Sequence, residues 1–383
     1  MDTVRLKIPY ALPQNNTCFS EQVKVRDLGL QTPISGSRFV YSNQTWRKER
    51  TNQGIYTPKY WIEQDYVNSS ITFLVLEFSV PKLLFGENLT ELKNEHFPLI
   101  VEKLQSFLEE ISLHFTKAQI ENLTPILFAV GKNIDITKLY SCDTAIRALS
   151  PFDNRFRSKQ RIIQFSNDSG KELYFSNKST TFKVYEKIPE MIANAKTREE
   201  RKLVDFWIEL SKSKYGKEKV LAVEVLRFEL TLKTKATITQ AMKKYGDLSP
   251  TFQSIFKKEM WDELVQKEVG DIFNQPLNNF IFLATLQKPT IDAFLDKNYK
   301  SIRAKDMARG ILQSLQEKGL AKTKRYYTQN YCRKTWHNYA KCIKQLEEKT
   351  DFTTLKNATS IEIHSHILRQ FNINPKMQTK LEL

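Results

Sequence analysis

A tyrosine between two lysines stands out in the segment TFKVYEK, residues 181–187. Side chains alternate between the two faces of an extended strand, so Lys183, Tyr185 and Lys187 would share one side. Nearby positive charge favours the phenolate form of a tyrosine and also binds phosphate, which is the setting of a nucleophile that attacks phosphate esters. Tyr174, in the preceding LYFSNK segment, is a second candidate. The other interpretation is a tyrosine on an ordinary exposed strand face.

Two carboxylates lie in segments that should form strands. Glu77 interrupts the apolar run ITFLVLEFSV, where a buried charge must be paired, neutralised or bound to a cation. Glu229 belongs to VLRFELTLK, whose alternation places Arg227, Glu229, Thr231 and Lys233 on one face. If the two strands are neighbours, Glu77 and Glu229 could share one Mg²⁺ or Mn²⁺, since these ions prefer carboxylate oxygen. The alternative for Glu77 is a structural ion pair. The alternative for the strand that contains Glu229 is an ordinary solvated sheet face.

Basic residues favour a polyanionic partner. The chain of 383 residues carries 59 Lys and Arg against 43 Asp and Glu, a net charge of +16. Half of that excess, +8, lies in residues 301–350, which hold 12 basic and 4 acidic residues. Nucleic acid is the leading partner for such a charge, and an anionic membrane surface is a weaker one. Four cations at alternate positions, Arg155, Arg157, Lys159 and Arg161, would also match a phosphate backbone, unless they form a mobile basic loop.

The basic C-terminal part resembles a helix-turn-helix arrangement. Helical periodicity over residues 301–318 is followed by a basic stretch and a second predicted helix over residues 328–349. The candidate DNA-binding residues here are Lys324, Arg325, Arg333, Lys334 and Lys341. An ordinary basic helix is the alternative.

Several other classes of protein and site are disfavoured. Only 11 of the 383 residues are glycine, and neither GxxxxGK[ST] nor GxGxxG occurs, so ATP-driven and dinucleotide chemistry are not expected. The four scattered cysteines predict reduced thiols in a cytosolic protein, and no signal peptide or transmembrane helix is expected. His364 and His366 form one HxH pair, which on a strand could bind a metal, but no second motif supports it.

The elements that must position these residues form two groups. Strands are predicted over residues 4–8, 71–80, 126–130 and 220–233, with a hairpin over 172–187 and helices over 98–115 and 199–212. Beyond residue 236 only helices are expected, over residues 237–245, 249–269, 288–295, 301–318 and 328–349. The sequence therefore predicts an α+β fold, with a sheet domain over residues 1–235 and a mainly helical domain over residues 236–383.

At these residues the chain resembles the gene-II-type replication initiators of filamentous phages and related plasmids. The resemblance follows the order DTVRLKIPY, LEFSVPKLLFGENL, GKNIDI, FKVYEK and VLRFELTLK, and it covers most of the chain. It implies an antiparallel-sheet nuclease domain followed by a helical DNA-binding domain. It also implies a metal-dependent, single-strand DNA endonuclease and ligase that nicks a double-strand origin in the bacterial cytoplasm. The tyrosine joins the 5′ phosphate, and the free 3′ OH primes rolling-circle synthesis.

The resemblance also assigns roles to individual residues. Tyr185 matches the nucleophile and Lys187 the lysine beside it. In the mechanism that we expect, Lys183 or Lys187 assists the attack of Tyr185. Glu77 and Glu229 match acidic positions interpreted as ligands of Mg²⁺ or Mn²⁺, and Lys82 and Arg227 match basic positions near them. Relatives often carry an acidic residue or histidine on the strand that here contains Phe128 and Ala129, so a third ligand is either missing or supplied by Asp135.

The expected partners are double-stranded origin DNA and single-stranded DNA. A recruited host helicase and a homodimer are left open. The competing hypothesis is a DNA-binding regulator without enzymatic activity, which would use the same basic C-terminal part and keep the carboxylates as structural pairs.

Overall fold

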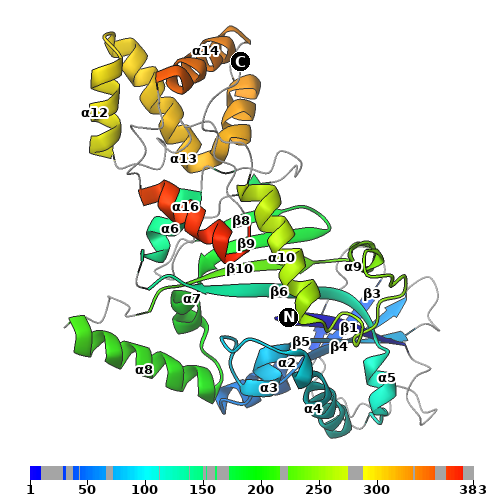
Figure 1. The fold of residues 1–383 in the computed structure, drawn as a ribbon. Coiled ribbons are helices and arrows are strands. Elements are labelled where there is room, and N and C mark those ends of the chain that lie inside the picture. The colour runs from blue at the N-terminus through cyan, green and yellow to red at the C-terminus, as the bar shows by residue number, and fades with distance from the viewer. Residues whose placement is uncertain are drawn as a thin grey trace.

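The computed structural model describes most of the chain and shows one sheet with helices around it (Figure 1). The described residues are 1–9, 29–31, 38–42, 44–65, 72–111, 113–137, 139–149, 152, 160–161, 172–215, 223–274, 288–330, 333–349 and 359–373. The strands are β1 (Thr3–Pro9), β2 (Gly29–Gln31), β3 (Arg38–Ser42), β4 (Lys59–Asp65), β5 (Thr72–Ser79), β6 (Thr124–Asp135), β7 (Gln160–Arg161), β8 (Glu172–Ser176), β9 (Thr180–Glu186) and β10 (Val225–Leu232).

The helices lie between and after these strands. They are α2 (Gln44–Asn52), α3 (Val80–Phe85), a 3₁₀ turn (Asn94–His96), α4 (Phe97–Glu110), α5 (Lys117–Glu121), α6 (Cys142–Leu149), α7 (Lys187–Asn194), α8 (Arg198–Tyr215), α9 (Lys235–Lys243), α10 (Lys258–Phe273), α12 (Lys288–Asn298), α13 (Ile302–Asn330), α14 (Arg333–Lys349) and α16 (Thr359–Gln370).

The sheet is antiparallel at every described strand pair. Its order is β2-β3-β4-β5-β1-β6-β10-β9-β8-β7. The chain's first strand, β1, is therefore central, between β5 and β6. This order brings the N-terminal residues next to β6 and β10, which lie far along the sequence.

One face of the sheet is apolar and carries the core. Alternate residues of the strands point to this face, and Phe78 and Phe228 are almost completely buried there. Helices and loops cover it: Phe78 packs edge-on against Phe252, and Phe228 packs against Phe273 of α10 and Phe371 after α16. The opposite face is polar, and it carries the residues that could do chemistry.

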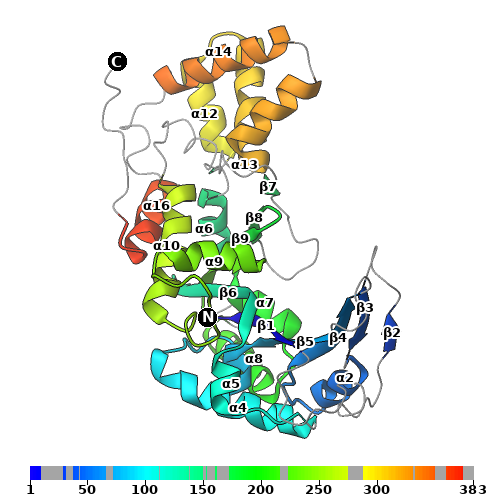
Figure 2. The ribbon, with the colours of Figure 1, turned by 90° about the vertical axis from the view of Figure 1, so that its right-hand side faces the viewer.

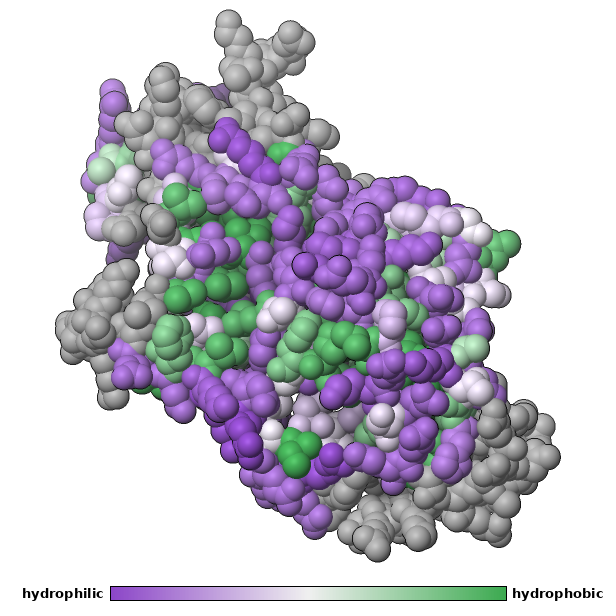
Figure 3. Space-filling model, turned by 60° about the horizontal axis from the view of Figure 1, so that its bottom comes forward, coloured by the Kyte–Doolittle hydropathy of each residue, from purple (hydrophilic) through white to green (hydrophobic). Residues whose placement is uncertain are grey.

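A smaller apolar cluster holds α7 and α8 against β10. Ile188 and Met191 of α7 pack with Trp207 of α8, and Val225 of β10 borders them. Seen with the bottom of Figure 1 brought forward, apolar side chains gather in the middle of the surface with hydrophilic residues around them (Figure 3). The cluster fixes α7, and therefore the end of β9, relative to the sheet.

The C-terminal helices occupy two places. In Figures 1 and 2, α12, α13 and α14 form a group beyond the β7–β9 end of the sheet, whereas α16 lies beside α6 and α10. Contacts of α16 with both helices agree with this picture. A division of the chain at residue 235 stays a prediction.

The sequence predicted the fold class correctly. The α+β fold with an antiparallel sheet followed by a mainly helical part is confirmed, as are the β8–β9 hairpin and the helices α4 and α8. Two arrangements that the sequence left conditional do not occur. β5 and β10 are not neighbours, because β1 and β6 lie between them. His364 and His366 lie on α16 and not on a strand, so they point in different directions; His364 is buried against the carbonyl oxygen of Phe273.

The predicted turn in the basic region lies inside α13. Helical structure continues from Ile302 to Asn330, past the predicted end at residue 318. However, the Thr323 hydroxyl donates to the Ser314 carbonyl at 3.0 Å, whereas nine residues of straight helix would span about 13.5 Å. The chain therefore bends sharply between these two residues.

Candidate active site

A cavity of about 430 Å³ opens on the polar face of the sheet. Its walls come from β1, β5, β8, β9, β10, α2, α3 and α7. The lining residues are Asp2, Thr3, Arg47, Tyr56, Glu77, Phe78, Ser79, Lys82, Asn88, Glu172, Lys183, Tyr185, Glu186, Glu190, Asn194 and Glu229. Six of these side chains are carboxylates and three are cationic, so a strongly basic chain has an acidic cavity.

Tyr185 lies at the wall of this cavity near the end of β9. Its hydroxyl donates to Oε2 of Glu229 on the neighbouring strand β10, at 3.1 Å. Burial, and then the carboxylate of Glu229, raises the pKa of Tyr185 well above its usual value. The phenol is therefore protonated at neutral pH, and it must lose its proton to an adjacent base in order to act as a nucleophile.

A buried guanidinium organises the carboxylates beside Tyr185. Arg227 of β10 donates to Asp2 at 2.8 Å and to Asn133 of β6 at 2.7 Å, and its Nε lies 3.7 Å from Glu229. Room for it comes from Gly131, because a Cβ built there would lie 2.9 Å from the guanidinium. Arg227 therefore joins three strands beneath the cavity.

The carboxylates of Asp2 and Glu229 lie close enough to shift each other's pKa. Burial, and then the charge of Asp2, raises the pKa of Glu229 to about 7. Burial also opposes ionisation of Asp2, but Arg227 and Lys187 outweigh it and hold the pKa of Asp2 below its usual value. The pair therefore keeps Asp2 charged and lets Glu229 hold a proton near neutral pH.

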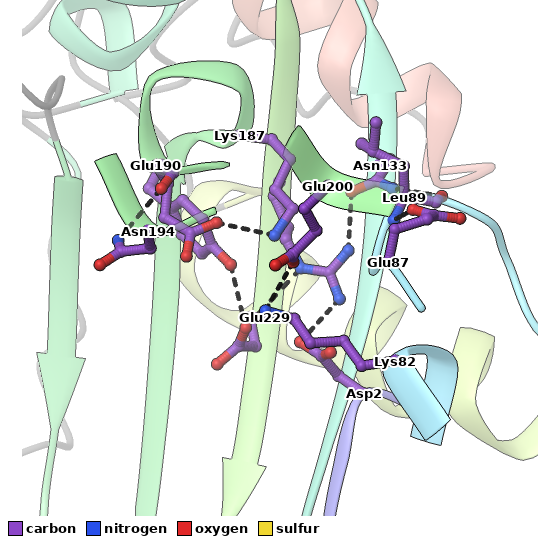
Figure 4. Close-up of polar contacts among 12 residues, drawn as sticks. Asp2, Lys82, Glu87, Leu89, Asn133, Lys187, Glu190, Asn194, Glu200 and Glu229 are labelled. Atoms are coloured by element: carbon purple, nitrogen blue, oxygen red, sulfur yellow. Dashed lines mark hydrogen bonds and ion pairs between the residues drawn. The ribbon is translucent and has the colours of Figure 1, made fainter. Parts of the chain in front are cut away.

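Three lysines near the tyrosine each bind a carboxylate. Lys183 lies 3.8 Å from Glu172 on the paired strand β8, and Lys82 of α3 lies 2.6 Å from Glu200 of α8. Figure 4 shows Lys82 and Glu200 reaching toward each other across the site. Both lysines line the cavity and are partly exposed, so a phosphate could reach them.

Lys187 has a different position from the other two lysines. Its side chain is completely buried at the start of α7 and donates to Glu190 at 2.8 Å, as Figure 4 also shows. Burial, and then the charge of Arg227, lowers the pKa of Lys187. Its ammonium group lies 5.8 Å from the centre of the Tyr185 ring. Lys187 thus lies in the protein interior beside the Tyr185 ring and does not line the cavity.

A loop after α3 is tied to both β6 and α8. Asn133 donates to the Leu89 carbonyl at 3.1 Å, and the carboxylate of Glu87 accepts backbone N–H groups inside the same loop (Figure 4). The Thr197 hydroxyl, just before α8, bonds to the carbonyl of Gly86, whose φ is +79°. Glycine adopts this conformation without strain, so the sequence PKLLFG ends α3 here and turns the chain toward the cavity.

The predicted metal ligands are not together. Glu77 lines the cavity but is bound by Arg5 of β1, and two strands separate β5 from β10. Glu77 is thus a partly exposed ion pair, one of the alternatives that the sequence allowed. Asp135, at the far end of β6, accepts hydrogen bonds from Thr137 and does not line the cavity. Among the residues that the structure describes, no cluster of three or more acidic, His or Cys side chains could hold a metal.

Tyr174 lies outside the cavity on β8, where its ring contacts the ammonium group of Lys183. Hydrogen bonds, first with the Ser176 hydroxyl, lower its pKa. The predicted DNA-binding residues Arg155 and Arg157 lie outside the described residues. The backbone of Arg161 is in β7, while Lys324 and Arg325 are in α13, and Arg333, Lys334 and Lys341 are in α14.

Sequence reasoning missed several residues of the site. Asp2 precedes the first strand and gains its role only because β1 is central in the sheet. Glu172 could have been found, since it pairs with Tyr185 once the hairpin register is known. Glu190 and Asn194 come from α7 at a spacing of four residues, which places them on one helix face toward the cavity.

The part of the chain that carries the sheet matches a known family. The model of a family described as the N-terminal part of the replication-associated gene II protein matches residues 2–249. The chain belongs to this family. The family comprises rolling-circle replication initiators, and it implies a protein that nicks and joins DNA and binds origin DNA. The resemblance seen in the sequence is therefore confirmed, and the matched residues include Tyr185 and the whole sheet.

No curated protein and no solved structure matches the chain. Initiators of this family are typically metal-dependent. Across the described ranges, every helix is too short or too polar to cross a membrane.

Proposed function

We propose that this initiator nicks one DNA strand by transesterification, with Tyr185 as the nucleophile. The observation that carries the proposal is the contact between Tyr185 and Glu229 at the wall of the cavity, at 3.1 Å. A nucleophile within hydrogen-bond reach of a base, with the base oriented by a third group, is the arrangement that covalent catalysis requires. Here Asp2 and Arg227 orient Glu229.

In the proposed reaction, the Tyr185 hydroxyl oxygen forms a bond to the scissile phosphorus, and its proton passes to Glu229. The bond from phosphorus to the 3′ oxygen breaks, and this oxygen takes up a proton from water and leaves as the free 3′ OH, while Glu229 returns its proton to solvent. The 5′ phosphate stays on the tyrosine. One phosphodiester replaces another, so the reverse reaction can rejoin the strand without ATP, in agreement with the missing nucleotide-binding motifs.

Lys82 and Lys183 would contact the phosphate in this scheme. Both are partly exposed at the cavity, and each is held at its place by a carboxylate, Glu200 or Glu172. A phosphate oxygen can take the place of a carboxylate on an ammonium group, because both are anionic acceptors. Lys187, buried behind the tyrosine ring, positions Tyr185 and Glu190 instead.

Asp2 and Glu229 fit a divalent metal better than the predicted pair does. Asp2 and Glu229 influence each other's ionisation at the same end of the cavity, whereas β1 and β6 separate the strands of Glu77 and Glu229. Mg²⁺ commonly uses one or two carboxylates, with substrate phosphate and water as its other ligands, so a cluster of three protein ligands is not needed. A Mg²⁺ or Mn²⁺ ion held there would stabilise negative charge on the phosphate.

The helices α12–α14 are the proposed duplex-binding part. His337, Lys341 and Lys344 are exposed on α14, one turn apart, so they share a face. Tyr339 is not on that face but stacks on Tyr327 of α13, at 3.9 Å between ring centres, and so holds the two helices together.

Incubation with supercoiled origin DNA and Mg²⁺ tests the proposal. We expect relaxed DNA that carries covalently bound protein, no nicking by Tyr185→Phe, and unchanged DNA binding by that variant. Tyr140→Phe, a partly buried tyrosine outside both the cavity and α12–α14, is the matched control and should nick normally. Nicking by Tyr185→Phe together with loss of nicking by Tyr174→Phe would assign the reaction to Tyr174. Cleavage that a chelator leaves untouched would refute the metal proposal, and tight footprinting without a nick would favour the regulator.

A further inference from the structure

We propose that the β8–β9 hairpin carries a second anion site, which binds a phosphodiester of the same DNA strand a few nucleotides from the one that is cut. This site, the hairpin cluster, consists of Tyr174, Ser176, Thr181 and Lys233. It rests on the proposed function only in its position relative to the nick. Nothing in the proposed reaction uses these four side chains.

The register of the sheet places the cluster next to the active site. Tyr174 is opposite Lys183, and Lys183 is opposite Glu229, while Ser176 is opposite Thr181 in the adjoining row. All of these side chains share the polar face, because they alternate along their strands. Lys183 lines the cavity, and its ammonium group also lies 5.8 Å from the centre of the Tyr174 ring. This lysine therefore connects the two sites.

The polar atoms of the cluster converge. The Ser176 and Thr181 hydroxyl oxygens are 3.1 Å apart, and Nζ of Lys233 donates to the Ser176 hydroxyl at 2.8 Å. The same two hydroxyls, first that of Ser176, lower the pKa of Tyr174, whose side chain lies on the same face of β8. Thr181 is only 3% exposed, whereas Lys233, Tyr174 and Ser176 are half-buried. The cluster is therefore anchored in the protein interior and is accessible to solvent on one side. Hydroxyl and ammonium groups are the side chains that commonly contact DNA phosphates.

Lys233 differs from the cations of the active site in the acceptors that it contacts. Lys82, Lys183 and Arg227 are each paired with a carboxylate. Lys233 donates to the Ser176 hydroxyl and to the Asn177 carbonyl, at 2.8 and 3.1 Å, and both of these acceptors are neutral. In the described part of the chain, no carboxylate therefore neutralises Lys233, and it can attract a phosphate.

The turn of the hairpin holds the cluster in a fixed shape. The side-chain oxygen of Asn177 accepts backbone N–H groups of Ser179 and Thr180, at 2.9 and 2.6 Å. The backbone N–H of Lys233 donates to the Ser179 carbonyl at 2.8 Å, which fastens the turn to the end of β10. Donors that are already in place lose little freedom when an anion binds.

The spacing fits one strand of DNA. Four residues of β9 separate Thr181 from Tyr185, which corresponds to about 13 Å along the strand. Single-strand binding sites span about 4 to 16 nucleotides, so a strand that reaches Tyr185 also reaches the cluster.

The test measures binding of a single-stranded oligonucleotide that spans the nick site, by fluorescence anisotropy at several salt concentrations. All proteins carry Tyr185→Phe, so no strand is cut. The slope of log K against log salt is negative. Loss of one phosphate contact reduces its magnitude by about 0.7 and weakens binding about 5-fold at 0.1 M salt. We expect this change for Lys233→Met and its reversal for Lys233→Arg. Lys243→Met, an exposed lysine on α9, removes the same charge and should leave the slope unchanged.

Oligonucleotides with one neutral methylphosphonate locate the contact. When this substitution is moved along the strand, it should weaken binding at a phosphate a few nucleotides from the nick site, and Lys233→Met should remove that sensitivity. Ser176→Ala should reduce it as well, which covers the case that Lys233→Met does not fold. If Lys233→Met keeps the slope and the same methylphosphonate profile, the hairpin cluster is not an anion site. Nicking by the protein with Tyr185 intact tests the proposed function separately, so either idea can fail alone.

Discussion

Replacing Arg227 by methionine should destabilise the fold strongly, since the guanidinium is the centre of the buried polar cluster. Its side chain is 6% exposed and that of Asp2 is 9% exposed, and their N and O atoms are 2.8 Å apart. Methionine has a similar length but no charge, so the Asp2 carboxylate would remain buried without its partner. Breaking a buried ion pair on one side costs about 3–5 kcal/mol of unfolding free energy.

Arg5→Met provides a control with the same chemical change. Arg5 also binds a carboxylate, Glu77, but the two side chains are 33% and 26% exposed. Water and salt screen such a pair, so its loss should cost only about 0–1 kcal/mol. The comparison isolates burial as the cause of the difference.

Urea unfolding at pH 7, followed by circular dichroism, measures both variants. The double variant Arg227→Met with Asp2→Asn should be more stable than the sum of the two single changes predicts, by about 0.5–3 kcal/mol, because it removes the orphaned charge. Equal destabilisation by Arg227→Met and Arg5→Met, or additive effects in the double variant, would refute the buried pair as the organiser of the site.

Three further predictions address other parts of the chain. Gly131→Ala should cost about 1–3 kcal/mol, since its Cβ would meet the buried guanidinium, whereas Gly310→Ala inside a helix should gain about 0.5–1 kcal/mol; urea unfolding checks both, and equal effects would contradict the steric argument. Burial lowers the pKa of His364 to about 4. The unfolded chain therefore binds the extra proton between about pH 6.5 and 4, so stability should fall as the pH falls through that window, by up to about 1.4 kcal/mol per pH unit, and His364→Gln should flatten the curve. Replacing both Lys341 and Lys344 by alanine should reduce the salt slope of duplex binding by about 1.8, and an unchanged slope would remove α14 from the duplex interface.

Local pattern was enough to predict the strands around the site and the polar face that they share. Alternation in VLRFELTLK and TFKVYEK placed Arg227, Glu229, Lys183 and Tyr185 on one side, and the structure has them there. These strands are neighbours, so the side-chain periodicity of two suffices to bring the residues together.

The order of the strands could not be predicted from local pattern. Glu77 belongs to an apolar strand like the others, and nothing in its neighbourhood shows that β1 and β6 separate it from β10. The same order gives Asp2 its place beside Glu229. Long-range pairing depends on which apolar faces pack together across the whole chain, and a single sequence does not display that.

The bend inside α13 shows a similar limit. The sequence predicted the end of a helix at residue 318, but the structure keeps helical backbone to Asn330. Only the contact between Thr323 and Ser314 reveals the bend. A pattern of residue types predicts that a helix forms, but tertiary contacts decide where it bends.

The central claim is that Tyr185 becomes joined to the cut strand, and mass spectrometry of the attached peptide tests it most directly. Trypsin should leave DNA-linked residues 184–187, VYEK, if Tyr185 is the nucleophile, and residues 172–178, ELYFSNK, if it is Tyr174. The proposed mechanism predicts a nucleotide adduct on Tyr185 in the VYEK peptide alone. An adduct on ELYFSNK, or nicked DNA with no peptide attached, would contradict it.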